Sequence, residues 1–299
     1  MQRFDVHAHF PTSDSTADAQ AFAEHMAKEG FVGGGIDAHW TPELAMRFMD
    51  ERGMQLQLLS LPLPLDAERT RAANERAADV VAAHPDRFGL LASLPMHEPE
   101  RAVEEITHAA DTLGADGFLL LSNYDGAYLG DERFEPVFAE LDRRNASVLV
   151  HPVLPAAFDR LGLGRPAPLI EYPMDTARTI VDAVFAGLLL RHPDLRLVLA
   201  HAGGVLPALS KRLLLLGVKG WVDNPHGITA DQLRAQLRSV YLDTAMAGDP
   251  VSLLPAVDMA GVDHLVFGSD FPPAGIDVID ETLHDLRTCL LYTSPSPRD

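Results

Sequence analysis

Two histidines, His7 and His9, stand two residues apart in the mostly apolar segment 4–10. On a β-strand, residues i and i+2 point to the same face, so both imidazoles would project together. Neutral imidazole is the commonest metal ligand among side chains. The pair therefore predicts half of a metal site, and the alternative is a pair of surface histidines on an edge strand.

Three other apolar segments are each followed by a residue of a ligand type, and these residues are His151, His201 and Asp270. If the segments are strands of one closed parallel barrel, their ends open into the same mouth, where catalytic residues gather in that fold. This convergence favours the metal site. In contrast, His84 and His192 come after predicted helices and before prolines, which is typical of a helix C-terminus.

The elements that would position these residues alternate between strand and helix. The apolar runs predict strands at 4–10, 54–61, 88–94, 117–121, 147–150, 195–200, 240–244 and 264–267. Helical patterns occupy 42–52, 66–83, 99–113, 131–144, 175–191, 205–216, 250–260 and the chain from 278 onward, with a further short helix within 17–28. Eight such units predict an α/β protein with a single-domain (β/α)8 TIM barrel. The alternative is a doubly wound open sheet, which the absence of Gly-X-Gly-X-X-Gly after the first strand disfavours.

The composition limits the partners and the compartment. The chain has 299 residues, 47% of them hydrophobic, and a formal net charge of −19. This acidic balance argues against nucleic acid and anionic membrane surfaces as partners. We find neither an apolar run of about 18 residues nor a basic and apolar leader, so we expect no membrane span and no signal peptide. The single cysteine, Cys289, excludes an intrachain disulfide and favours a reducing, cytoplasmic compartment.

The C-terminal residues 289–299 break the pattern of the chain before them. Their sequence, Cys-Leu-Leu-Tyr-Thr-Ser-Pro-Ser-Pro-Arg-Asp, resembles the translation of a transposase adapter used in sequencing libraries. We therefore expect a metal-dependent barrel over residues 1–288, with its last helix truncated, and a non-native tail over 289–299. A genomic locus that encodes the same tail would refute this interpretation.

The lysines bear on the number of metal ions. The chain has three, Lys28, Lys211 and Lys219, and none follows a predicted strand. A two-metal site of this kind would need a bridging carboxylated lysine, so we expect one divalent ion. A set of histidines and a carboxylate with an open position suits Zn²⁺, with Mn²⁺ as the alternative.

Several short motifs are shared with a known group of proteins. They are Asp5-Val-His-Ala-His9, Trp40-Thr-Pro-Glu43, Gly114-Ala-Asp-Gly117, Tyr128-Leu-Gly130, Val150-His-Pro152, Ala200-His-Ala-Gly-Gly204, Leu242-Asp-Thr-Ala245 and Phe267-Gly-Ser-Asp-Phe-Pro272. Over nearly all of residues 3–288 the chain resembles the amidohydrolase superfamily. Within it, the resemblance is to the branch of metal-dependent decarboxylases that includes the aminocarboxymuconate-semialdehyde, γ-resorcylate and 6-methylsalicylate enzymes.

The resemblance implies a role for each site residue. Four residues would be the metal ligands: His7, His9, His151 and Asp270. His201 would lie beside the metal and orient or deprotonate its water, or would itself be a ligand. Asp270 would also donate a proton to the ring carbon that carries the carboxylate, with His201 positioning it or the water.

The implied activity is non-oxidative decarboxylation of a small hydroxybenzoate-like or related unsaturated carboxylic acid. The 6-methylsalicylate type is favoured by the Tyr128 stretch and by Ile170-Glu-Tyr-Pro173. The aminocarboxymuconate enzyme holds a substrate carboxylate with an arginine in its first loop, and residues 11–39 contain no arginine. Two alternatives stay open: a hydrolase of the same superfamily, such as a lactonase, and a metal-binding barrel without catalysis. The resemblance also leaves a homodimer open.

Overall fold

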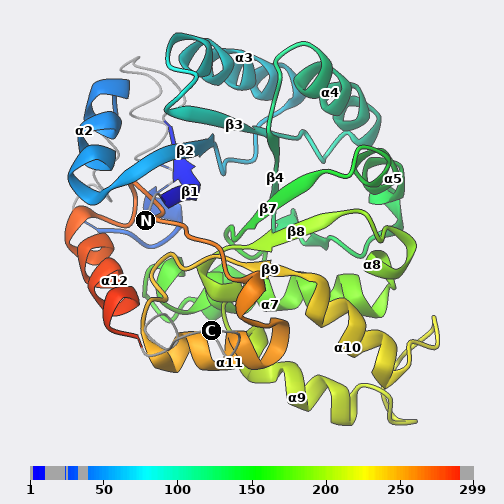
Figure 1. Cartoon of the computed structure of the whole chain (residues 1–299). Helices are drawn as coiled ribbons and strands as arrows, with labels where there is room; N and C mark the ends of the chain where they lie inside the picture. The colour runs from blue at the N-terminus through cyan, green and yellow to red at the C-terminus, as the bar shows by residue number, and fades with distance from the viewer. Residues whose placement is uncertain (1–2, 11–23, 25, 33–39, 290–299) are drawn as a thin grey trace, which may run out of the picture.

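Seven parallel strands form one curled sheet in this protein. The computed structural model describes residues 3–10, 24, 26–32 and 40–289, and the strand order is β1-β2-β3-β4-β7-β8-β9. The strands are β1 (Arg3–His9), β2 (Met54–Ser60), β3 (Phe88–Ser93), β4 (Gly117–Leu121), β7 (Ser147–His151), β8 (Arg196–Leu199) and β9 (Tyr241–Leu242). Figure 1 shows them curling around a common centre, with helices outside. This is the architecture of the predicted α/β barrel.

The eighth strand is a correction to the prediction. We expected a strand over 264–267, but the 3-10 helix η3 (Val262–His264) covers its start. From there, Leu265 makes an isolated parallel bridge to Leu242 of β9. The segment 265–271 therefore occupies the place of an eighth strand without forming a continuous ladder.

The same segment also closes the barrel against β1. Phe271 bridges Ala8, and the backbone N–H of Asp270 donates to the carbonyl of His7 at 2.8 Å. Asp270 has a φ of 58°, which lies in the left-handed region and cannot continue a β ladder. The turn that presents the Asp270 side chain thus interrupts the strand.

Most predicted helices form close to their expected bounds. They are α2 (Pro42–Arg52), α3 (Ala67–Ala83), α4 (Pro99–Asp111), α5 (Glu135–Arg143), α9 (Leu206–Leu216), α11 (Pro250–Ala260) and α12 (Ile276–Thr288). Most of the predicted helix 17–28 lies outside the described residues, as does the tail from residue 290 onward. No helix in the described part of the chain combines the length and the apolar character that a membrane span requires.

Helix α7 (Ala167–Phe185) differs most from its prediction. We expected a helix over 175–191, but α7 continues through Pro173, and Gly187 with a φ of 71° separates it from the short α8 (Leu188–Arg191). A proline inside a helix loses one hydrogen bond. The carbonyl of Pro173 itself accepts from the backbone N–H of Val205 at 3.2 Å, so a tertiary contact joins this turn of the helix to the start of α9.

Several short elements were not predicted. They are the hairpin of β5 (Asn123–Tyr124) and β6 (Ala127–Tyr128), the helices α6 (Phe158–Leu161) and α10 (Ala230–Ser239), and the 3-10 helix η2 (His201–Gly203). The helix predicted over 131–144 begins with the 3-10 turn η1 (Glu132–Phe134). Helix α10 had a usable signal. Thr229 and Gln232 form a capping box at its start, and that spacing marks helix N-termini.

The barrel has an apolar interior below its mouth. Leu91 of β3, Leu119 of β4, Leu149 of β7 and Ala200 form a small buried cluster of their own. A much larger cluster fills the layer between the strands and the helices. Because successive residues of a strand point to opposite faces, each strand contributes to both. The polar residues of the site therefore lie over a packed floor.

Candidate metal centre

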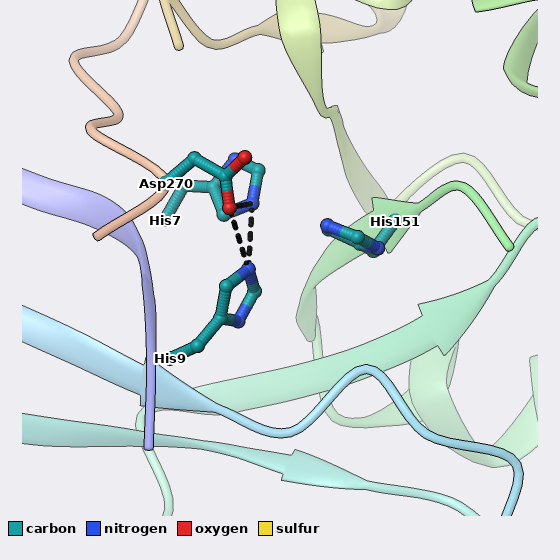
Figure 2. A group of neighbouring side chains, drawn as sticks. All are labelled: His7, His9, His151 and Asp270. Carbon is teal, nitrogen blue, oxygen red and sulfur yellow. Dashed lines mark hydrogen bonds and ion pairs between the residues drawn. The ribbon is translucent and has the colours of Figure 1, made fainter. Parts of the chain in front are cut away.

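The four predicted ligands come together at the carboxyl ends of the barrel strands. They are His7, His9, His151 and Asp270, and each offers one ligand atom, all within 4.8 Å of one another. All four are buried. Figure 2 shows three imidazoles and one carboxylate facing a common point, with His151 opposite the other three. The two histidines of β1 project together because they are two residues apart on one strand.

The tautomers of His7 and His9 follow from their outer hydrogen bonds. The Nδ1 of His7 lies 2.7 Å from the Oδ2 of Asp243, a carboxylate that only accepts. The Nδ1 of His9 lies 2.9 Å from the Oγ of Ser60. Since Ser60 donates its own proton to the carbonyl of Ala8 at 3.1 Å, it accepts from His9. In both neutral rings the proton is thus on Nδ1, and Nε2 keeps its lone pair.

His151 has the same arrangement. Its Nδ1 lies 2.7 Å from the carbonyl oxygen of Pro152, which can only accept, so Nε2 again has the lone pair. The two Nε2 atoms of His7 and His9 are 3.1 Å apart. Metal-ligating histidines commonly donate their other N–H to a carboxylate or a carbonyl group in this way.

The two oxygens of Asp270 face different partners. Its Oδ1 lies 3.0 Å from the Nε2 of His9 and 3.4 Å from that of His7, yet this buried oxygen makes no hydrogen bond. Its Oδ2 lies 3.3 Å from the Nε2 of His201. Burying such an oxygen without a partner costs free energy, so the contacts around Oδ1 favour a bound cation.

These side chains fit a divalent metal ion. Three imidazole lone pairs and one carboxylate oxygen converge in a buried space, and in their neutral tautomers the histidines offer no proton to one another there. Three histidines and a carboxylate are a donor set typical of zinc and related metals.

Charge and burial compete at the centre. Burial would lower the pKa of His7, but the charges of Asp243, Asp270 and Asp5 outweigh it and raise that pKa to about 9. A metal ion would therefore have to displace the proton from the Nε2 of His7, since a ligating imidazole is neutral. Burial, together with the neighbouring histidines, holds the pKa of His151 well below its ordinary value. Burial would raise the pKa of Asp270, but the charge of His7 and the contacts of His201 and His9 hold it well below its usual range. Asp270 is therefore ionised.

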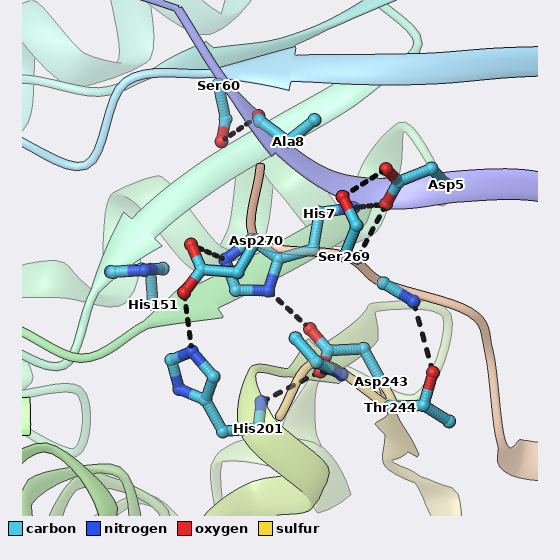
Figure 3. A network of polar contacts seen from close by, with 12 residues as sticks. Asp5, His7, Ala8, Ser60, His151, His201, Asp243, Thr244, Ser269 and Asp270 are labelled. Atoms are coloured by element: carbon cyan, nitrogen blue, oxygen red, sulfur yellow. Dashed lines mark hydrogen bonds and ion pairs between the residues drawn. The ribbon is translucent and has the colours of Figure 1, made fainter. Parts of the chain in front are cut away.

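Asp243 is a site residue that we did not predict from the sequence. It is fully buried, and besides orienting His7 its Oδ1 accepts from the backbone N–H of His201 at 2.8 Å and of Ala245 at 3.0 Å. Figure 3 shows Asp243 between His7 and His201. A signal was available, because Asp243 lies within a predicted strand, close to its carboxyl end.

A second buried carboxylate lies beneath the ligands. Asp5 accepts from the side chains of Gln57 at 2.9 Å and Ser269 at 2.5 Å, and its other oxygen accepts from the backbone N–H of Ser269 at 2.9 Å. It shares the inward face of β1 with His7 and His9. Asp5 therefore joins the strand that carries the histidines to the segment that carries Asp270, as Figure 3 shows.

The backbone at the mouth is strained at the two proposed catalytic positions. His201 has a φ of 56° and Asp270 a φ of 58°, and non-glycine residues seldom adopt this left-handed region. Gly204, just after η2, also has a positive φ, and a Cβ there would overlap the carbonyl of Pro173. The segment that follows β8 can therefore turn tightly against α7 only with glycine at this point.

Two histidines that we did not assign to the site, His84 and His192, lie at the ends of helices. His84 caps the end of α3, and the Nε2 of His192 lies 3.0 Å from the Oε1 of Glu135. The three lysines also stay on the exposed surface. The structure thus brings together the residues after the strands and leaves those after the helices apart.

Comparison with known proteins gives a consistent result. A family model described as amidohydrolase matches residues 4–298. The chain is 35% identical over 303 residues to decarboxylase yanB of Aspergillus niger, which covers 94% of this chain and 80% of yanB. It is also 35% identical over 291 residues to the 6-methylsalicylic acid decarboxylase acuB of Aspergillus aculeatus, with 93% and 86% covered.

Two solved structures show the same fold. An amidohydrolase II superposes with a TM-score of 0.82 at 29% identity, over 96% of this chain and 92% of the other. A dihydroxybenzoic acid decarboxylase from Polaromonas sp. JS666, solved with manganese and 2-nitroresorcinol, superposes with a TM-score of 0.79 over 99% and 92%. The latter is 23% identical, so its likeness is one of fold.

Proposed function

This chain belongs to the amidohydrolase family, and we propose that it is a metal-dependent, non-oxidative decarboxylase of a small hydroxybenzoate-like acid. The 6-methylsalicylate type is favoured by the similarity to acuB. The proposal rests on the position of Asp270, whose two carboxylate oxygens can play two different roles. One of its oxygens faces three buried imidazoles, and the other lies 3.3 Å from His201.

We propose one divalent ion, held by His7, His9, His151 and Asp270, and favour Zn²⁺ over Mn²⁺ from the donor set. When bound, such an ion would act as a Lewis acid and as a template for the substrate's carboxylate and its neighbouring hydroxyl oxygen. Asp243 and Ser60 would keep the imidazoles of β1 oriented.

The residues of the chain would carry the proton. Decarboxylation replaces the carboxylate on a ring carbon by a proton and releases CO₂, and protonation of that carbon interrupts the aromaticity that loss of CO₂ restores. A proton on the Nε2 of His201 is close enough to pass to the Oδ2 of the ionised Asp270, which would then donate it to the ring carbon. Because Oδ1 faces the ligands separately, Asp270 can do so while it still holds the metal.

A hydrolase is the second candidate. The matching family model is described as amidohydrolase, and an ionised Asp270 could accept a proton from water. A metal-binding barrel without catalysis is the third.

The oligomeric state and the compartment are also proposals. We propose a homodimer, testable by sedimentation, and a cytoplasmic location, testable by fractionation.

The test combines metal analysis with assays of CO₂ release from hydroxybenzoates and of lactone opening. We expect about one metal ion per chain and CO₂ release. Asp270→Asn should keep part of the metal but lose turnover by about 100-fold or more, because an amide cannot serve as the acid or base. Asp66→Asn, at the start of α3, is the matched control and should behave as wild type.

Each opposite outcome has a clear meaning. Lactone opening without CO₂ release would favour the hydrolase, and bound metal without turnover on either panel would favour the inactive barrel. Full decarboxylase activity in Asp270→Asn would remove the proton-transfer role.

A further inference from the structure

His151 differs from the other two proposed histidine ligands in what orients its ring. The outer nitrogens of His7 and His9 meet side chains that come from other parts of the barrel. The Nδ1 of His151 instead meets the carbonyl oxygen of the next residue, Pro152, at 2.7 Å. That contact sets the tautomer of His151, but it ties the ring only to the backbone beside it.

Tyr172 of α7 packs against this imidazole. The centroids of the two rings are 6.3 Å apart, and their planes meet at 75°. Edge-on pairs at such distances are favourable beyond the area that they bury. The other rings recorded beside His151 in the described part of the chain belong to the site histidines His7, His9 and His201. Tyr172 therefore supports the ring of His151 from outside the site.

The hydroxyl group of Tyr172 is fixed in turn by Glu29. It donates to the Oε2 of Glu29 at 2.5 Å, and Glu29, from the connection between β1 and α2, is only 1% exposed. Burial, together with the charge of Glu29 and this hydrogen bond, holds the pKa of Tyr172 well above its ordinary value. The hydroxyl group thus keeps the proton that it donates.

The backbone around Glu29 is fastened to the start of α7. The carbonyl of Glu29 accepts from the backbone N–H of Ala167, the first residue of that helix, at 2.9 Å. Gly30 has a φ of 86°, and a Cβ there would come within 2.9 Å of the carbonyl oxygen of Arg165. The close backbone packing therefore brings Glu29 to the helix that carries Tyr172.

We propose that Tyr172 and Glu29 are positioning residues, which hold the imidazole of His151 in the orientation that a divalent metal ion requires. The inference rests on the metal centre of the proposed function and gives the two residues no part in the chemistry. It links the connection after β1 to the ligand at the end of β7, through one hydrogen bond and one ring contact.

The first experiment measures the affinity for Zn²⁺ by competition with a chromophoric chelator. Tyr172→Phe keeps the ring but loses its tether, so the affinity should fall about 10-fold, as when other residues that orient a ligand are lost. Glu29→Leu should give a similar loss. Glu29→Gln keeps an oxygen that can accept from Tyr172, so its affinity should stay near that of the wild type.

Tyr128→Phe is the matched control. Tyr128 likewise donates to a buried carboxylate, that of Asp175, and α7 takes part in both contacts. This variant should lose stability in urea but keep its affinity for Zn²⁺. The double variant Tyr172→Phe/Glu29→Leu should bind Zn²⁺ no more weakly than either single variant, since all three lack the same contact.

The second experiment needs neither metal nor turnover. Crystal structures of the metal-free proteins should show one orientation of His151 in the wild type and more than one in Glu29→Leu. Such a change, with weaker Zn²⁺ binding but no CO₂ release from any acid, would support the positioning role and contradict the decarboxylase. An unchanged orientation of His151 in Glu29→Leu would overturn the proposal, and so would an unchanged Zn²⁺ affinity in Tyr172→Phe.

Discussion

Asp243 shows how one side chain outside the ligand set can organise the centre. Its Oδ2 accepts from His7, and its Oδ1 accepts from the backbone of His201. The first contact sets the tautomer of a proposed ligand, and the second holds the backbone of the proposed proton-transfer residue. The two oxygens must therefore both be acceptors.

We expect Asp243→Asn to weaken metal binding by about 10- to 100-fold, the usual effect of losing an orienting partner. An asparagine replaces one acceptor by an NH₂ donor, so either His7 or the N–H of His201 loses its partner. Competition with a chromophoric chelator measures the change, and Asp66→Asn is the control. Unaltered affinity in Asp243→Asn would show that Asp243 does not orient His7 in solution.

At the scale of elements, the buried carboxylate of Asp175 joins α7 to the segment that follows β4. Asp175 is fully buried and accepts from the side chains of Ser122 at 2.6 Å, Asn123 at 2.7 Å and Tyr128 at 2.9 Å. These donors lie after β4 and on the β5–β6 hairpin. The same helix carries Tyr172 to the mouth, so its anchoring also places this ring near His151.

Replacing Asp175 by alanine should lower the free energy of unfolding by about 3 kcal/mol or more, because several buried donors lose their acceptor at once. Tyr128→Phe, which removes one of these hydrogen bonds, should cost about 1 kcal/mol. Urea unfolding measures both. A loss in Asp175→Ala no larger than that in Tyr128→Phe would mean that the donors find other partners.

At the scale of the whole molecule, the barrel is closed by separate backbone hydrogen bonds to β1 and β9, without a continuous ladder. The segment 265–271 meets β9 and β1 through isolated bridges, and Asp5 adds side-chain and backbone hydrogen bonds with Ser269. Burial raises the pKa of Asp5 to about 6, although the hydrogen bonds of Ser269 and Gln57 act in the opposite direction. The donors that surround this buried carboxylate therefore add to the backbone hydrogen bonds that close the barrel.

Ser269→Ala should accordingly lower the free energy of unfolding by about 1–3 kcal/mol, since Asp5 loses a donor in a site that water does not reach. Ser210→Ala, which removes a hydroxyl bonded to Pro207 within one helical turn, should cost less. Urea unfolding of the two variants provides the comparison. Equal losses would show that the hydroxyl contact with Asp5 adds nothing to barrel closure.

The sequence by itself determined the elements and the candidate residues. Apolar runs and helical patterns are local signals, and they were sufficient to place seven strands, most helices and the strand-end residues His7, His9, His151 and Asp270. The left-handed turns at His201 and Asp270 were not visible, because nothing local marks a non-glycine residue for that conformation. The start of α7 before Pro173 was not predicted either, because a proline inside a helical pattern usually ends or kinks the helix.

Only the tertiary structure decided which acidic and polar groups face one another. Asp243 and Asp270 both belong to segments that run toward the mouth, and the sequence does not distinguish an orienting carboxylate from a ligand. The direction of each side chain depends on the closure of the barrel, which brings residues more than two hundred positions apart into contact.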